Sequence, residues 1–216
     1  MKPLSLTLKN FGPYINETID FTKFEDSSLF LISGKTGSGK TTIFDGMSYA
    51  LFGESSGKLR LGKEMRSTFA DPSEATEVTL LFKHNEYLYE LNRLPEQELF
   101  KKRGTGVRKQ SAKISLIVKD AQGKELRAYS KRREVDELIQ ELLHLNANQF
   151  AQIVLLPQGE FRTFLIAKSD EKEKVLRNLF GTELYQLFSE NLKERLKIAN
   201  QEIQETQQKI ELKTEQ

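Results

Sequence analysis

The stretch "GKTGSGKTT" at residues 34–42 limits the possible folds of this chain more than any other feature. It meets the pattern G-x-x-x-x-G-K-[ST] at Gly34, Gly39, Lys40 and Thr41. Apolar residues 29–32 precede it, and apolar residues at helical spacing follow it up to Gly53. A phosphate-binding loop of the P-loop type needs this position between a strand and a helix. We therefore expect an α/β fold in which the strand at 29–32 is buried on both faces of a parallel sheet.

The residue types of the loop suit a triphosphate, whose oxygens need several N–H donors at close range. Glycines let the backbone bend so that successive N–H groups point inward, and the following helix adds its free N–H groups and positive dipole end. Lys40 is expected to reach the β- and γ-phosphates of ATP, and the Thr41 hydroxyl to hold Mg²⁺. The residues expected to contact ATP are Gly34, Lys35, Thr36, Gly37, Ser38, Gly39, Lys40, Thr41 and Thr42.

Composition excludes several classes of protein. The 216 residues include no cysteine, which excludes disulfides and thiolate metal sites and predicts a cytoplasmic location. The two histidines, His84 and His144, lie in separate segments, so we expect no metal site of the nuclease kind. The sequence has no apolar run of membrane-spanning length and no signal-peptide pattern. The net charge of +2 gives no overall argument for nucleic acid, which leaves local clusters of charge to consider.

Alternating apolar residues predict three hairpins and one amphipathic helix. The hairpins are expected at 4–21 with a turn at "NFGP", at 77–94 with a turn at Asn85-Glu86, and at 113–129 with a turn at 120–123. The helix is expected at 131–144, with Ser130 as its N-cap and Val135, Leu138, Ile139 and Leu142 on one face. Further on, a buried-type strand at 152–156 is expected to stop at Pro157, followed by helices at 162–168 and 169–181.

The tail from Thr182 has a different pattern. Its apolar seam is formed by Leu192, Leu196, Ala199, Ile203, Thr206 and Ile210. These residues are spaced by 4, 3, 4, 3 and 4, a heptad pattern that predicts a coiled coil. The alternative is an amphipathic helix packed on the domain, which usually shows a wider stripe. We expect two domains, an ATPase lobe at 1–181 and the start of a truncated antiparallel coiled coil at 182–216.

One part of a hydrolytic site is missing from the sequence. A P-loop ATPase also needs an acidic residue after a hydrophobic strand, to bind Mg²⁺ and orient water. The best candidate, Asp120 in "ISLIVKD", follows a lysine and opens a predicted turn, and no glutamate comes after it. No Ser-Gly-Gly signature is present either. The rest of the machinery is therefore expected outside these residues.

Several motifs together resemble the SbcC family, the SMC-like ATPase subunits of bacterial SbcCD nucleases. They are "KNFGPY", "IDF", "GKTGSGKTTIFDGMSYALFG", "MRSTFADPSEATEV", "SKRREVDELI" and "QFAQIVLLPQGEFRTFL". The resemblance implies the N-terminal lobe of an ABC-type ATPase head, with Gln158 in a Q-loop that ligates Mg²⁺ and senses the γ-phosphate. It also implies a C-terminal lobe of the same protein, a second head across ATP, DNA, and an SbcD-like nuclease that carries the nuclease chemistry.

Two further sets of residues allow more than one interpretation. Lys101, Lys102, Arg103, Arg108 and Lys109 form a basic cluster that predicts contacts to DNA phosphates, and a solvated loop is the alternative. A second basic cluster, at 131–133, opens a helix, where cations oppose the dipole, which hints at an outside partner. Phe11 and Tyr14 are candidates for the surroundings of the adenine, or else ordinary core or surface aromatic residues.

These patterns favour one half of a DNA end-processing ATPase that gates a partner nuclease. A P-loop kinase of small metabolites is the alternative enzyme, but it needs a lid and an acceptor pocket within the chain. A structural coiled-coil protein with a degenerate nucleotide site is the third possibility, and the intact Gly39, Lys40 and Thr41 argue against it.

Overall fold

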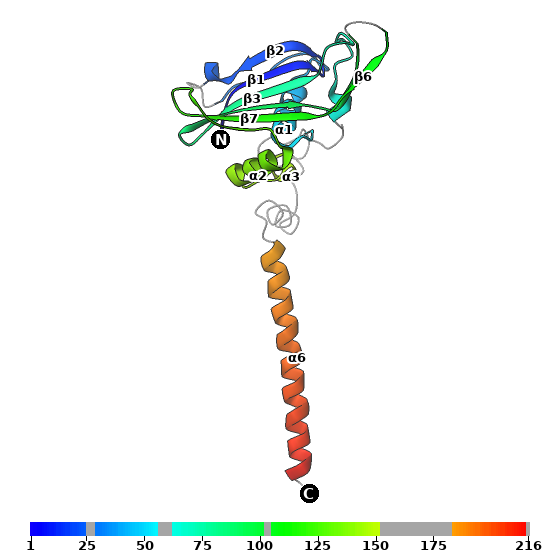
Figure 1. The fold of residues 1–216 in the computed structure, drawn as a ribbon. Helices are drawn as coiled ribbons and strands as arrows, with labels where there is room; N and C mark the ends of the chain where they lie inside the picture. Colours follow the sequence, from blue (N-terminus) through cyan, green and yellow to red (C-terminus); the bar gives the residue numbers. More distant parts are fainter. Residues whose placement is uncertain (25–28, 56–61, 102–104, 152–182, 215–216) are drawn as a thin grey trace. The chain divides into compact units, whose positions relative to one another are not determined.

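The computed structural model describes residues 1–24, 29–55, 62–101, 105–151 and 183–214, which are drawn in colour in Figure 1. The chain divides into two units, residues 1–158 and 159–216, and each is described by itself. The strand at 152–156, the helices at 162–168 and 169–181, and Gln158 lie outside the described residues.

A six-stranded antiparallel sheet forms the first unit (Figure 1). Its strands are β1 (Lys2–Phe11), β2 (Tyr14–Asp20), β3 (Glu77–His84), β4 (Tyr87–Leu94), β7 (Lys113–Lys119) and β8 (Glu125–Tyr129). They lie in the order β2-β1-β3-β4-β7-β8. The three hairpins expected from the sequence are confirmed, including the turn at Asn85, whose φ is 53°.

One face of this sheet carries the core. Alternate residues on four strands are buried: Leu6, Leu8, Val78, Leu80, Phe82, Tyr89, Leu91, Leu116 and Val118. An antiparallel sheet with one packed face and one solvated face produces this alternation of apolar and polar residues. The buried face meets the helix α1 (Lys40–Phe52), which ends at Gly53 with a φ of 75°.

Close approach between α1 and the sheet depends on Gly46. A Cβ atom at this position would lie 2.6 Å from Cδ2 of Leu8, so any other residue would displace the Leu8 side chain or the helix. Two further helices, α2 (Arg132–Leu143) and α3 (Ala147–Phe150), add to the same core. Val135 and Ile139 of α2 are buried, and the ring of Phe150 packs on that of Phe52 with centroids 5.3 Å apart.

Three expectations about local structure are wrong or incomplete. The segment 29–32 is not a strand, and the side chains of Leu29 and Leu31 are each 88% exposed. A strand needs hydrogen-bonding neighbours, and among the described residues none pairs with this segment. The N-cap of α2 is Lys131 rather than Ser130, and its side chain makes no capping hydrogen bond. A separate hairpin of β5 (Gln97–Phe100) and β6 (Val107–Gln110) was not expected.

The second unit is described as one helix, α6 (Glu183–Thr214), of 32 residues. The larger apolar side chains of the expected seam are exposed: Leu192, Leu196, Ile203 and Ile210. Exposed apolar residues at heptad spacing fit a helix that pairs with another helix. Within the residues that the structure describes, no helix has both the length and the apolar character needed to cross a membrane.

Two 3₁₀ turns complete the described elements, at Phe21–Phe24 and Gly62–Met65. The second of these precedes a segment that is tied to the end of β1. Arg66 pairs with Phe11 in an isolated bridge, and the amide of Ser67 donates to the carbonyl of Asn10. The β1–β2 turn is therefore held in place by residues far along the chain.

Candidate phosphate-binding site

The loop at 34–39 leads directly into α1, as the motif predicts. Gly37 and Gly39 have φ angles of 84° and 91°, in the left-handed region that favours glycine. Gly39 is the N-cap of α1, and no side chain caps the helix there. The first turn of an α-helix has amide groups without partners inside the helix. These amides, together with the positive end of the helix dipole, make this end of α1 suited to an anion.

Lys40, the first residue of α1, turns its side chain back onto this loop. Its Nζ donates to the carbonyl of Gly34 at 2.8 Å and to the carbonyl of Lys35 at 2.9 Å. The ammonium group therefore lies over the backbone of the loop. A compact ammonium with three donors is suited to bind phosphate oxygens as a point charge. The structure thus brings Lys40 and the loop backbone together.

Exposure differs among the residues of the motif. The segment 34–38 and Thr41 are exposed, whereas Thr42 is buried against Gly12. Thr41 is therefore open to solvent, and its expected role as a Mg²⁺ ligand stays a prediction. The buried Thr42 side chain instead contributes to packing, so its expected contact with ATP is limited to its backbone amide.

The turn between β1 and β2 supports the loop from the side. The hydroxyl of Tyr14 donates to the carbonyl of Gly39 at 3.1 Å, and a Cβ atom on Gly39 would lie 2.5 Å from Cγ of Pro13. Burial, followed by repulsion from Glu17, raises the pKa of the Tyr14 phenol, so the hydroxyl keeps its proton and remains a donor at neutral pH. The amide of Gly12 donates to the carbonyl of Met65 at 2.7 Å, which fixes the turn itself.

Phe11 does not lie where an adenine ring can stack on it. Its side chain is fully buried, with its ring 5.9 Å from that of Tyr49. The core interpretation is therefore correct for Phe11. Sequence reasoning missed Gly12 and Pro13 as supports of the loop, because a turn of this kind shows no signal of what it contacts in space.

Asp120, which the sequence pattern disfavours as the catalytic acidic residue, lies in a turn. Asp120 Oδ1 accepts from the amides of Gln122 and Lys124, both at 2.9 Å, and closes the β7–β8 hairpin. Those bonds explain its position without any catalytic role. The described residues also contain no group of three or more His, Cys, Asp or Glu side chains placed to hold a metal ion.

The first basic cluster lies on the β5–β6 hairpin. Lys101 and Arg108 are exposed, and Lys109 is ion-paired with Glu96 at 2.9 Å. That hydrogen bond and the charge of Glu96 raise the pKa of Lys109. Lys102 and Arg103 lie outside the described residues. Among the described residues of this cluster, Lys101, Arg108 and Lys109 are all exposed, and Lys109 is paired with a carboxylate.

The second basic cluster is neutralised within α2. Lys131 pairs with Glu134, Arg132 with Asp136 and Arg133 with Glu137, at 2.8, 3.3 and 2.8 Å. Pairs at spacings of three and four on a helix offset the cost of cations near its N-terminus. The sequence hint of an outside partner at 131–133 therefore has an internal explanation.

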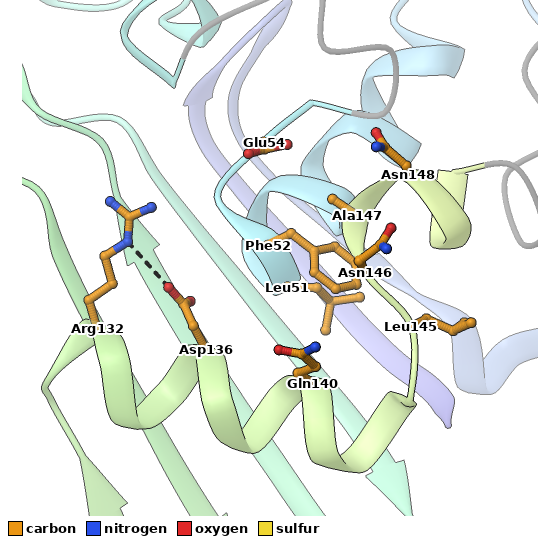
Figure 2. Close-up of a pocket in the computed structure, with 10 residues that line it drawn as sticks. All are labelled: Leu51, Phe52, Glu54, Arg132, Asp136, Gln140, Leu145, Asn146, Ala147 and Asn148. Carbon is orange, nitrogen blue, oxygen red and sulfur yellow. Dashed lines mark hydrogen bonds and ion pairs between the residues drawn. The ribbon is translucent and has the colours of Figure 1, made fainter. Parts of the chain in front are cut away.

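A pocket of ≈380 Å³ lies at the other end of α1, away from the loop. Figure 2 shows side chains from the end of α1, from α2 and from the segment leading into α3 around it. They are Leu51, Phe52, Glu54, Arg132, Asp136, Gln140, Leu145, Asn146, Ala147 and Asn148. The pocket shares no residue with the phosphate-binding loop.

A family model and two curated relatives match this chain over most of its length. A family model described as an AAA domain matches residues 5–216. The SbcC subunit of nuclease SbcCD from Lactococcus lactis subsp. lactis (strain IL1403) is 46% identical over 197 residues, covering 89% of this chain and 18% of that protein. Its counterpart from Staphylococcus aureus (strain MRSA252) is 45% identical over 212 residues, covering 98% and 20%. The resemblance drawn from the motifs is confirmed, and the chain spans about a fifth of the length of these relatives.

A solved chain from work on ATP-driven dimerization and DNA-stimulated activation of SMC ATPases is similar at 19% identity and a TM-score of 0.44. That similarity covers 83% of this chain and 99% of the solved chain.

Proposed function

Because the chain belongs to the AAA domain family, we propose that it is the ATP-binding N-terminal lobe of a DNA end-processing ATPase. In this proposal the whole protein acts in double-strand-break repair and gates a partner nuclease. The observation that carries the proposal is the anion site at the start of α1, where Gly39 leaves the first helical amides uncapped and Lys40 lies over the loop. The names of the relatives, which are SbcC subunits of SbcCD nucleases, support the nuclease partner.

The residues at 34–42 fit the phosphates of ATP. The Gly37 backbone has a left-handed φ, and nothing lies within 4 Å of a Cβ built there, so the loop has open space on that side. In the proposed site the backbone amides and Lys40 bind the phosphates, and the Thr41 hydroxyl ligates Mg²⁺. ATP supplies the phosphoanhydride bond that is cleaved. Gln158 is proposed as a further Mg²⁺ ligand and as the sensor of the γ-phosphate.

Hydrolysis is proposed to need the C-terminal lobe of the same protein. The segment 29–31, just before the loop, exposes large apolar side chains that a neighbouring strand or lobe would cover. In the proposed whole protein that cover comes from the C-terminal lobe, which also brings the acidic residue for Mg²⁺ and water. Two such heads are proposed to close on ATP, and α6 is proposed to pair with a returning helix along its exposed seam.

The isolated chain is expected to bind MgATP without turning it over. Positioning and charge stabilisation supply nearly all catalysis of phosphoryl transfer, and no acidic side chain for this role was found in the sequence. The test measures MgATP binding by calorimetry and phosphate release by the purified 216-residue chain, with Lys40→Ala as the control for contaminating ATPases. Robust turnover that is lost in Lys40→Ala would contradict the proposal and favour the small-metabolite kinase.

The basic hairpin is proposed to contact DNA phosphates in the assembled complex. Replacing Lys101, Lys102, Arg103, Arg108 and Lys109 with glutamine is expected to weaken duplex binding. It is also expected to reduce the slope of log K against log salt by up to about 4 to 5, because each contact releases counterions. Affinity is measured by fluorescence anisotropy at a series of salt concentrations, using the full-length protein with its nuclease partner.

A matched control for that experiment is offered by α2. Replacing Lys131, Arg132 and Arg133 with glutamine removes cations that are already paired with their own helix. This triple variant is expected to keep the original salt slope. An unchanged slope in the five-residue variant would instead identify the β5–β6 hairpin as a solvated loop.

A further inference from the structure

A buried arginine fixes the end of the phosphate-binding helix that lies away from the loop. Arg93 is on β4 and is only 5% exposed. Its Nε donates to the carbonyl of Ala50 at 3.0 Å, and its Nη2 donates to the carbonyl of Leu51 at 3.2 Å. Both carbonyls belong to the last turn of α1, where an α-helix has acceptors without partners. One side chain from the sheet therefore closes the C-terminal end of α1.

The charge of Arg93 is compensated from two directions. Nη2 also pairs with Oδ1 of Asp136 on α2 at 3.0 Å, and the helix end adds its partial negative charge. Burial lowers the pKa of Arg93, opposed by its bond to Asp136, but an arginine stays charged. Removing one member of such a group leaves buried partners uncompensated.

The turn that ends α1 packs closely against the guanidinium of Arg93. Gly53, the C-cap, has a φ of 75°, and a Cβ atom there would lie 2.7 Å from Nη1 of Arg93. The guanidinium therefore occupies the space that a side chain at this position would fill. Arg93 is thus in direct contact with the helix end as well as hydrogen-bonded to it.

The two ends of α1 are held by different elements of the fold. At the N-terminal end Tyr14 bonds to Gly39, and in the middle Gly46 lies against Leu8 of β1. At the C-terminal end Arg93 of β4 bonds to α1 and to Asp136 of α2, and the ring of Phe52 packs on that of Phe150. A helix of 13 residues is about 20 Å long and acts as a rod, so a tilt at one end moves the other. The amides that face a phosphate group are at the end opposite Arg93.

We propose that Arg93 is a positioning residue for the phosphate-binding loop, which it holds by locking α1 to β4 and, through Asp136, to α2. This inference rests on the proposed function, because it concerns the binding of MgATP at that loop. Arg93 acts on the loop only through the helix. A purely structural role would lower the stability of the fold but leave the MgATP affinity of the folded molecules unchanged.

The test compares MgATP affinity, measured by calorimetry on the full 216-residue chain, with the folded fraction measured by circular dichroism at the same temperature. Arg93→Met keeps the length of the side chain and removes its donors. It is expected to weaken MgATP binding by about ten- to a hundredfold, since small misplacements of binding groups have effects of this size. Arg93→Lys keeps one cation and is expected to recover part of the loss. Asp136→Asn is expected to have a smaller effect in the same direction.

Arg132→Gln is the matched control, because it removes an ion pair to the same Asp136 and leaves the bonds of Arg93 to α1 in place. It is expected to bind MgATP within about twofold of the original chain, the change typical of a surface ion pair. If folded Arg93→Met binds MgATP normally, the inference is overturned. Should Arg93→Met not fold, normal affinity in both Arg93→Lys and Asp136→Asn overturns it instead. An original chain that does not bind MgATP would overturn the proposed function, and the inference with it.

Discussion

Lys40→Ala is expected to lower the affinity for MgATP by about a hundredfold. Hydrogen bonds to a charged group contribute about 1.5–3 kcal/mol each, so the loss of one such bond between the ammonium and a phosphate oxygen accounts for a change of this size. In the structure its donors already engage the carbonyls of Gly34 and Lys35, so the side chain needs no large movement to face a ligand on the loop. Calorimetric titration of the chain with MgATP measures the effect directly.

Two further variants test whether the loss of affinity is specific to the ammonium group of Lys40. Lys40→Arg keeps the charge but replaces a compact ammonium by a planar fork, so it is expected to restore only part of the affinity. Lys23→Ala removes an exposed lysine of the 3₁₀ turn at Phe21–Phe24 and is expected to bind MgATP normally. If Lys40→Ala retains normal affinity, the motif does not bind a nucleotide in this chain.

Gly39→Ala is expected to lower the MgATP affinity about as much as Lys40→Ala, because of steric overlap rather than loss of charge. The added Cβ atom would lie 2.5 Å from Cγ of Pro13 and 3.0 Å from the hydroxyl of Tyr14, at a φ of 91°. A non-glycine residue in the left-handed region costs about 1–2 kcal/mol even in open space. The overlap adds to this, so Gly39→Ala is expected to displace the start of α1 and to reduce MgATP affinity about a hundredfold.

Gly37→Ala separates the cost of the left-handed backbone from the cost of the steric overlap. Gly37 has a similar φ of 84°, but nothing lies within 4 Å of a Cβ atom built on it. Its alanine variant therefore carries the cost of the backbone without the overlap, and its loss of affinity is expected to stay below about thirtyfold. Pro13→Ala combined with Gly39→Ala removes the closest overlapping atom and is expected to regain part of the binding. Equal losses in Gly37→Ala and Gly39→Ala would show that the contact with the β1–β2 turn has no role.

Local sequence patterns were sufficient for most of the elements. The hairpins around Asn85 and Asp120 were found because alternation of apolar residues and turn residues are properties of neighbouring positions. The loop at 34–39 and its position before a helix were predicted for the same reason, since its glycines, Lys40 and the following helix are contiguous. The buried face of α2 followed from helical spacing alone.

The alternation of side chains along β4 predicts that Arg93 is buried. In β4 it follows Tyr89 and Leu91 at intervals of two, which places it on the buried face of a strand. A cation on such a face signals a buried partner. What that partner is cannot be read from the strand, because Ala50 and Asp136 are each 43 positions away from Arg93.

The sequence by itself determined the loop at 34–39, the helix after it and the hairpins, because each depends on residues that are neighbours along the chain. Only the tertiary structure decided the contacts between distant segments. It showed that residues 29–31 expose their side chains, that the cations of α2 are already paired, and that Tyr14 and Arg93 hold opposite ends of α1. The physical reason is that hydrogen bonding and burial depend on which groups meet in space, and an apolar run such as 29–32 becomes a strand only where another strand supplies its hydrogen bonds.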